Sequence, residues 1–134
     1  MIRVLLVDDQ SVVRRGLLMR LALEPDLKVV GAARSSEEAL MLARTTVPDV
    51  VVMDIEMQGI DGVQAIRQMR DLTPNGAVIV LTMRGGHETR ARALEAGALA
   101  FVEKQGGAES LLREIRQAVP GEWHKHDQGS EVLR

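Results

Sequence analysis

Five short apolar runs recur along the chain at a nearly constant interval, and this interval constrains the fold more than any other feature. The runs are Ile2 to Val7, Lys28 to Gly31, Val50 to Met53, Ala77 to Leu81 and Leu99 to Val102. Their starts lie 26, 22, 27 and 22 residues apart. One strand, one helix of three or four turns and two short loops need about this length. The interval therefore predicts a repeated β-strand and α-helix unit.

The segments between the runs carry apolar residues at helical spacing. These residues are Val13, Leu17 and Leu21, then Ala39 and Ala43, then Val63 and Ile66, and finally Ala108, Leu112, Ile115 and Val119. Because the strand-sized runs are continuously apolar rather than alternating, we expect a parallel sheet covered by helices on both faces. The pattern predicts an α/β doubly wound domain over residues 1–119.

Two segments depart from this regular pattern. The fourth predicted helix, near residues 87–96, has only a thin apolar stripe, so we expect it to be mobile. From Pro120 onward the periodicity is lost, and residues 120–134 are predicted to form a linker or a disordered tail. His124 and His126 could contact a metal, but an unstructured tail is the favoured interpretation.

The composition excludes several classes of function. The chain has 134 residues and no cysteine, so it has no thiol chemistry and no cysteine-based metal site. The formal net charge of −2 offers no basic field for nucleic acid. No apolar run approaches the roughly 20 residues of a membrane span. We expect one cytoplasmic domain with an aliphatic core, since the only aromatic residues are Phe101 and Trp123.

Polar residues follow four of the five apolar runs. They are Asp8 and Asp9 after the first run, Asp54 after the third, Thr82 after the fourth, and Lys104 just beyond the fifth. In a parallel α/β sheet the ligand crevice lies outside the carboxyl ends of the strands, where the strand order changes direction. We therefore expect these side chains to converge.

Each residue also has a purely structural interpretation. Asp8 and Asp9 could cap the following helix, and Asp54 could cap a loop. Thr82 could simply end a strand, and Lys104 could be a solvated charge. Their joint placement argues against this, because the three acids come from strands that become neighbours if the order is 2-1-3-4-5. Two like charges about 4 Å apart repel by about 4 kcal/mol at a dielectric of 20. The acids therefore need compensation.

A divalent cation and Lys104 could supply that compensation. Mg²⁺ binds carboxylate and carbonyl oxygens and keeps several waters. A hydroxyl such as that of Thr82 can donate to an oxyanion. A carboxylate nucleophile beside a metal, a lysine and a hydroxyl is the arrangement that an aspartyl phosphate requires.

The residues at these positions resemble the receiver domain of bacterial two-component response regulators. The resemblance rests on Asp8-Asp9, Asp54, Met57 with Gly59, Asp61-Gly62, Thr82, Ala93-Leu94-Glu95-Ala96-Gly97-Ala98 and Lys104. It covers residues 1 to about 119. Segments 12–17, 24–31 and 48–54 are similar to the LuxR-class subfamily, whose members usually carry a C-terminal helix-turn-helix domain. The expected fold is flavodoxin-like, with five parallel strands in the order 2-1-3-4-5 and five helices.

The resemblance also implies roles for individual residues. Asp54 would be the phosphoacceptor, and Asp8, Asp9, Asp54 and the main-chain carbonyl of Glu56 would hold Mg²⁺. Thr82 and Lys104 would bind the phosphoryl oxygens. Phe101 would be the switch aromatic, although as the chain's single phenylalanine it could also be core filler.

Two residues depart from the family pattern. Gln58 stands where proline often follows the methionine, and Gln105 follows Lys104 where many receivers have proline. The second change excludes a cis X-Pro turn and leaves the geometry of the Lys104 loop open.

The expected function is a phosphorylation switch that receives its phosphoryl group from a sensor histidine kinase. The protein would not be a turnover enzyme, and it would control transcription through a DNA-binding domain absent from this chain, without touching nucleic acid or membrane itself. One alternative is an Asp-nucleophile phosphatase of the haloacid dehalogenase type, which would prefer Asp where Glu56 stands. The others are an inactive interaction module and, as the poorest fit, a dinucleotide-binding fold, which would need a Gly-rich turn after the first strand.

Two further expectations concern tuning and assembly. Glu56 and Arg84, each two positions beyond a site residue, are predicted to set the lifetime of the phosphoryl group by covering the crevice. Alternatively, Arg84 could contact the phosphoryl oxygens, or both side chains could simply be solvated. Phosphorylation is expected to favour a homodimer. The candidate faces are that of the helices near Ser11 and Val119, which is slightly preferred, and that of the fourth helix and fifth strand with Arg90, Arg92 and Phe101.

Overall fold

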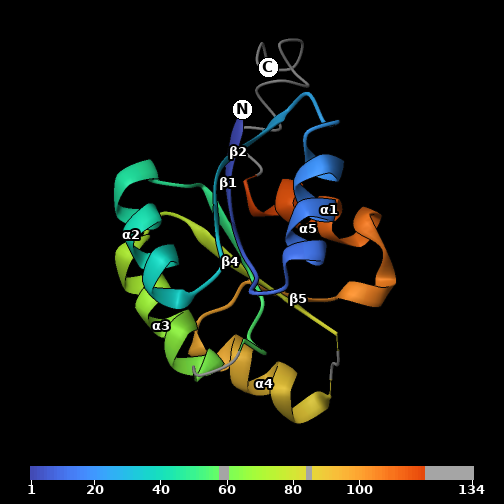
Figure 1. Ribbon diagram of the computed structural model, residues 1–134. Coiled ribbons are helices and arrows are strands. Elements are labelled where there is room, and N and C mark those ends of the chain that lie inside the picture. The colour runs from blue at the N-terminus through green and yellow to red at the C-terminus, as the bar shows by residue number, and fades with distance from the viewer. Residues whose placement is uncertain (58–60, 84–85, 120–134) are drawn as a thin grey trace, which may run out of the picture.

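Five parallel strands form a single sheet at the centre of the molecule (Figure 1). The computed structural model describes residues 1–57, 61–83 and 86–119. The strands are β1 (Ile2–Val7), β2 (Leu27–Ala33), β3 (Val50–Met53), β4 (Ala77–Thr82) and β5 (Ala100–Glu103), and their order is β2-β1-β3-β4-β5. The predicted fold class and strand order are confirmed. The predicted tail, with His124 and His126, lies outside the described residues.

Helices cover both faces of the sheet. They are α1 (Ser11–Leu21), α2 (Ser36–Thr46), α3 (Gly62–Leu72), α4 (His87–Ala96) and α5 (Ala108–Ala118), with a short 3₁₀ turn, η1 (Lys104–Gly106), before α5. In Figure 1, α1 and α5 lie on one side of the sheet, and α2, α3 and α4 lie on the other. The five predicted helices are all present.

The core is divided by the sheet into two aliphatic clusters. Leu5 and Val7 of β1 pack beneath α2, α3 and α4, whereas Val4 and Leu6 pack beneath α1 and α5. All four residues of β3 are buried. Because both faces of these strands are covered, the side chains along them are apolar, except for the half-buried Arg3 of β1. The continuous apolar runs in the sequence have this cause.

The register of the sheet aligns the carboxyl ends of β1, β3 and β4. Val7 pairs with Met53, and Met53 pairs with Val80. The backbone N–H of Asp54 donates to the carbonyl of Val7 at 2.9 Å. The residues that follow β1 and β3 therefore lie side by side at the carboxyl edge.

The loop between β3 and α3 is shaped by two residues of the sequence motif. The Asp61 side chain accepts hydrogen bonds from the N–H groups of Val63 and Gln64 and caps α3. A Cβ at Gly62 would lie 2.6 Å from the carbonyl oxygen of Ile55. Only glycine fits this close approach, so these two motif residues act on the loop that carries Asp54.

The helix α4 contributes only small side chains to the core. Its only buried residues are Ala93 and Ala96, whereas α5 buries three larger residues, Leu111, Leu112 and Ile115. The expectation that α4 is mobile stays a prediction. Across the three described ranges, no helix has the length and apolar character needed to cross a bilayer.

Candidate phosphoacceptor site

Three carboxylates meet at the carboxyl edge of the sheet. One ligand oxygen from each of Asp8, Asp9 and Asp54 lies within 4.8 Å of the others. Asp8 and Asp54 are buried, with 1% and 4% of their surface exposed, and Asp9 is exposed. Asp8 and Asp9 directly follow β1 and Asp54 directly follows β3, so adjacent strands bring the three acids together as the sequence predicted.

Lys104 lies between the two buried carboxylates. Its Nζ is 2.8 Å from Asp8 Oδ2 and 3.0 Å from Asp54 Oδ2, and only 7% of its side chain is exposed. The interpretation of Lys104 as a solvated charge is therefore wrong. The 3₁₀ turn η1, which begins at Lys104 and contains Gln105, still delivers the amine to the site without the proline that many receivers have.

The second oxygen of each buried carboxylate supports its own loop. Asp8 Oδ1 accepts the N–H of Gln10 at 2.9 Å, and Asp54 Oδ1 accepts the N–H of Glu56 at 2.8 Å. The N-cap of α1 is Gln10, so Asp8 does not cap this helix. In both acids, one carboxylate oxygen thus accepts a backbone N–H and the other pairs with the Lys104 ammonium.

The buried carboxylates carry more negative charge than Lys104 can neutralise, and this excess favours the binding of a cation. Burial raises the pKa of Asp54 above its ordinary value, and the Asp8 charge adds to this, because the Glu56 N–H and Lys104 offset burial only in part. Burial by itself would lower the pKa of Lys104, but the contacts with Asp8 and Asp54 outweigh it and raise that pKa. One ammonium is shared by two carboxylates, and negative charge is in excess.

The donor set suits a hard divalent cation. Asp8 Oδ2 is buried and forms no hydrogen bond of regular geometry, although it pairs with the Lys104 ammonium. Carboxylate oxygens that converge from three residues, one of them exposed to water, are the ligands that Mg²⁺ prefers. The residues present therefore fit the ion.

Thr82 and Glu56 are joined across the mouth of the site. The buried Thr82 hydroxyl donates to Glu56 Oε1, and the backbone N–H of Met83 donates to the same oxygen at 3.2 Å. The sequence predicted that Glu56 lies at the mouth of the crevice, but not that its carboxylate accepts a hydrogen bond from Thr82. Arg84, its expected partner, and Gln58 lie outside the described residues.

Phe101 is half-buried on β5. It packs against the core cluster beneath α2, α3 and α4. The roles of switch aromatic and core filler are both compatible with this position.

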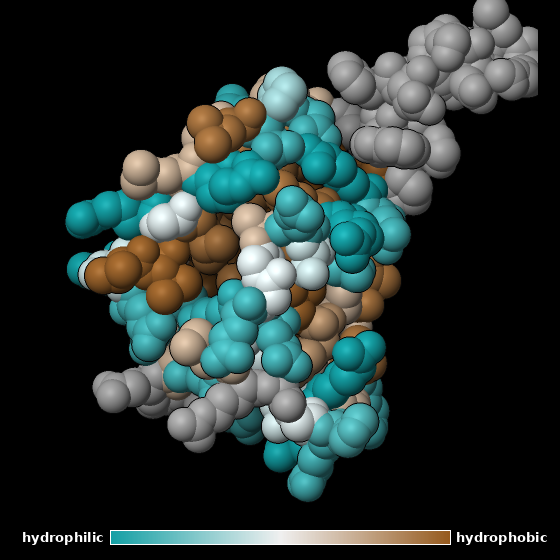
Figure 2. All heavy atoms as spheres, turned by 90° about the vertical axis from the view of Figure 1, so that its right-hand side faces the viewer, coloured by the Kyte–Doolittle hydropathy of each residue, from teal (hydrophilic) through white to brown (hydrophobic). Residues whose placement is uncertain are grey.

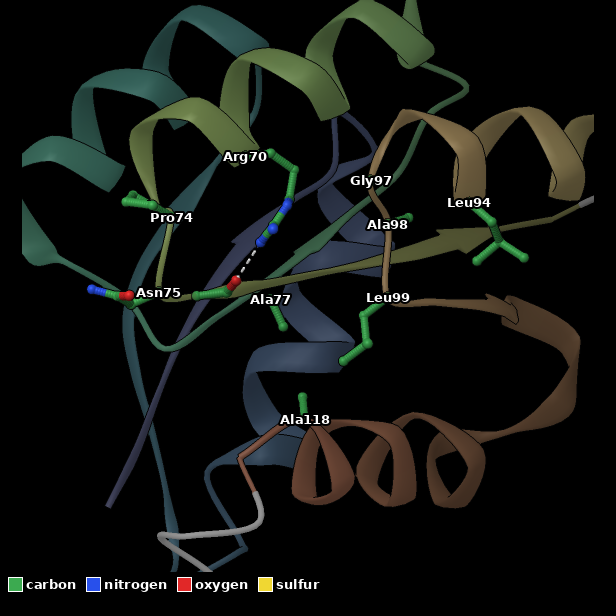
Figure 3. Close-up of a pocket in the computed structure, with 10 residues that line it drawn as sticks. Arg70, Pro74, Asn75, Ala77, Leu94, Gly97, Ala98, Leu99 and Ala118 are labelled. Carbon is green, nitrogen blue, oxygen red and sulfur yellow. Dashed lines mark hydrogen bonds between the residues drawn. The ribbon is translucent and has the colours of Figure 1, made fainter.

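One hollow adjoins the acidic cluster, and another lies away from it. A hollow of about 320 Å³ between α1 and α5 is lined by residues that include Val12, Leu17, Met83, Lys104 and Leu111. A second hollow, of about 430 Å³, lies at the opposite edge, near the start of β4, where Arg70 donates to the carbonyl of Gly76 at 2.7 Å (Figure 3). The second hollow is separate from the chemistry of the acids.

A doubly wound α/β domain thus carries three carboxylates, a lysine and a hydroxyl at the carboxyl edge of its sheet. The sequence model of the response regulator receiver domain matches residues 4–116. The chain belongs to the response regulator receiver domain family.

Relatives and solved structures agree with this assignment. The chain is 40% identical over 133 residues to the response regulator GacA of Pseudomonas aeruginosa, covering 99% of the chain and 62% of GacA. It is 39% identical to the transcriptional regulatory protein LiaR of Bacillus subtilis, covering 91% of the chain and 58% of LiaR. The chain thus spans about three fifths of the length of these curated relatives.

The solved structures include a member of the LuxR family. A LuxR-family two-component response regulator from Aurantimonas sp. is 34% identical with a TM-score of 0.83, covering 89% of this chain and 85% of that one. The receiver domain of the putative response regulator NarL from Mycobacterium tuberculosis has a TM-score of 0.82 at 28% identity, covering 90% and 97%. The resemblance to LuxR-class receivers is confirmed.

Proposed function

We propose that this receiver domain accepts a phosphoryl group on Asp54 from the phosphohistidine of a sensor histidine kinase. The observation that carries the proposal is the buried Asp54 carboxylate, which pairs with Lys104 and lies next to Asp8 and Asp9. Asp54 directly follows β3 at the carboxyl edge of the sheet. The same proposal places the protein in the cytoplasm, a compartment that suits its lack of cysteine.

In the proposed step, a carboxylate oxygen of Asp54 attacks the phosphorus of the donor. A P–O bond forms and the P–N bond to the imidazole breaks, and the released nitrogen keeps the electron pair and takes a proton from solvent. Lys104 pairs with the transferred oxygens, which the buried ammonium can do without first being desolvated. Hydrolysis by water later returns the carboxylate and releases inorganic phosphate.

Asp8, Asp9, Asp54 and the main-chain carbonyl of Glu56 would hold Mg²⁺. When bound, the ion neutralises charge on the transferring group. The protein's own residues position the acceptor: the Glu56 N–H and Lys104 fix the two oxygens of Asp54.

The consequence of phosphorylation is a change of surface. The added group carries about −1.5 to −2 charge. It would draw the Thr82 hydroxyl toward itself and let Phe101 turn inward, with rearrangement of α4 and β5. The protein would be a switch whose only chemistry is its own phosphorylation and dephosphorylation, not a turnover enzyme.

The output would be transcription. LiaR is named as a transcriptional regulatory protein, and the chain spans only part of it. A DNA-binding domain outside this chain would contact the DNA, and the receiver itself would contact the kinase and a second receiver. The phosphatase alternative has less support, because that class would prefer Asp at position 56, and the carboxylate of the Glu56 found there accepts a hydrogen bond from the Thr82 hydroxyl.

Intact-mass measurement after incubation with acetyl phosphate and Mg²⁺ tests the proposal. One stable phosphoryl adduct that disappears with a chelator supports a receiver. Continuous release of phosphate from many substrates without an accumulated adduct would favour the phosphatase, and no reaction at all would favour an inactive module.

A further inference from the structure

Two hydrogen-bond donors at the end of β4 converge on one oxygen of Glu56. The donors are the Thr82 hydroxyl and the Met83 backbone N–H, and the shared acceptor is Glu56 Oε1. Thr82 has 0% of its surface exposed, so its hydroxyl is shielded from water. Glu56 is exposed, so its side chain can leave without disturbing the core.

A hydroxyl and a backbone N–H aimed at one point form a site for an oxyanion. In this structure a carboxylate of the same chain fills that site. The backbone of Glu56 meanwhile donates to Asp54 Oδ1 at 2.8 Å. One residue therefore touches the acceptor with its main chain and the neighbouring oxyanion donors with its side chain.

We propose that the Glu56 carboxylate is an internal competitor that occupies the oxyanion site of Thr82 and Met83 until a phosphoryl group displaces it. The inference rests on the proposed function, since it assumes that the displacing anion is bound to Asp54. A second anion cannot share these two donors, because like charges at this separation repel strongly. The carboxylate must turn into solvent before the Thr82 hydroxyl can bind a phosphoryl oxygen.

This competition lowers the affinity of the site for a phosphoryl group. It also holds Thr82 in its resting position, because the hydroxyl has an anionic partner before phosphorylation occurs. Glu56 is thus a positioning residue whose side chain sets the threshold for activation. The role differs from that of a cover over the phosphorylated site, which would alter only the rate of hydrolysis.

Binding of beryllofluoride with Mg²⁺, measured by calorimetry, tests the competition directly. Glu56→Ala should bind this phosphoryl analogue about tenfold more tightly than the unmutated protein, which corresponds to about 1.4 kcal/mol. Glu56→Gln, which keeps an acceptor but loses the charge, should lie between the two. Glu95→Ala removes the same charge from an exposed position on α4 and should bind like the unmutated protein.

A second measurement needs no phosphoryl analogue. Amide hydrogen exchange of the Met83 N–H should accelerate several-fold in Glu56→Ala and stay protected in Glu56→Gln. Unchanged beryllofluoride affinity in Glu56→Ala, or unchanged exchange at Met83, would overturn the proposal. If neither the unmutated protein nor any variant, Glu95→Ala included, binds beryllofluoride, the proposed function itself is contradicted. The competition proposal then fails with it, because no phosphoryl group would reach the site.

Discussion

At the scale of single residues, Lys104 explains how two acids tolerate burial side by side. Asp8 and Asp54 each direct one oxygen at its ammonium and one at a backbone N–H. The raised pKa of Asp54 shows that this compensation is incomplete, since burial and the Asp8 charge still disfavour the carboxylate. A cation that binds there should therefore stabilise the folded protein.

We expect Mg²⁺ to raise the free energy of unfolding, measured by urea titration. A ligand that binds only the folded state adds about 2.7 kcal/mol when present at a hundred times its dissociation constant. Asp9→Asn should reduce this gain at a fixed Mg²⁺ concentration, because one converging carboxylate is lost. Asp71→Asn, at an exposed position on α3, is the matched control. An equal gain in the two variants would show that Asp9 is not a ligand.

The contacts of individual side chains are also the feature that the sequence predicts least completely. Asp8, Asp54 and Lys104 were predictable because each follows a strand, and parallel strands end at one edge. The side-chain partners of Glu56 were not predictable from the sequence. A long exposed side chain can turn several ways, and the donors to Glu56 come from the distant residues 82 and 83. Its position two residues beyond Asp54 was the only signal.

At the scale of elements, the strands were predictable because their burial on both faces makes them continuously apolar. The residues at which the strands end were less predictable. The prediction of Lys28 to Gly31 is too short, since β2 continues to Ala33 through pairing with β1. Alanine is not distinctive in a sequence, so backbone pairing rather than side-chain character sets this end.

An ion-pair network fastens α5 to the turn before β2. Arg116 contacts Asp26 at 2.8 Å and Glu24 at 2.6 Å, and Glu24 also contacts Arg20 at 2.7 Å. Hydrogen bonds from Arg20 and then Arg116 lower the pKa of Glu24. The contribution of Glu24 to stability is therefore present above its ordinary pKa of 4.5 and is lost as the pH falls through the lowered value.

Arg116→Ala should lower the midpoint of thermal unfolding at pH 7 by a few degrees. The difference from the unmutated protein should shrink once the pH falls below the lowered pKa of Glu24, because the Glu24 carboxylate is then protonated. Arg113→Ala, on the same helix at an exposed position, should have little effect at either pH. The network would be unimportant if the two variants melted alike at pH 7.

The helix α4 should open more readily than α5. Both are of similar length, but the buried residues of α4 are two alanines, whereas α5 buries two leucines and an isoleucine. Amide hydrogen exchange should therefore be at least about tenfold faster in α4, since each factor of ten requires a difference of only about 1.4 kcal/mol in opening free energy. Equal protection in the two helices would contradict the view that α4 is poised to rearrange.

At the scale of the whole molecule, the sheet separates two surfaces with different uses. The edge beyond β1, β3 and β4 carries the acids, and the α1–α5 side presents apolar side chains among polar ones (Figure 2). Val12 and Met19 of α1 are 81% and 68% exposed. A switch that acts on other molecules needs such a surface, and a second copy of the chain is the commonest partner.

Beryllofluoride with Mg²⁺ should shift the protein from monomer toward dimer in sedimentation experiments. Met19→Glu should prevent the shift if α1 and α5 form the interface, because it would bury a charge. Met41→Glu, on α2 and also exposed, should not. Dimerisation that survives Met19→Glu would favour the face of α4 and β5, and a monomer in both states would contradict association altogether.

We expect the fold to hold Asp54 as the single acceptor of a phosphoryl group. The most direct measurement is phosphorylation by acetyl phosphate with Mg²⁺, followed by hydroxylamine, which converts an acyl phosphate to a hydroxamate and marks the residue in peptide mass spectra. We expect one hydroxamate, at Asp54, and no adduct in Asp54→Asn. A phosphoryl group found at another residue, or an Asp54→Asn variant that is phosphorylated as fast as the unmutated protein, would contradict the claim.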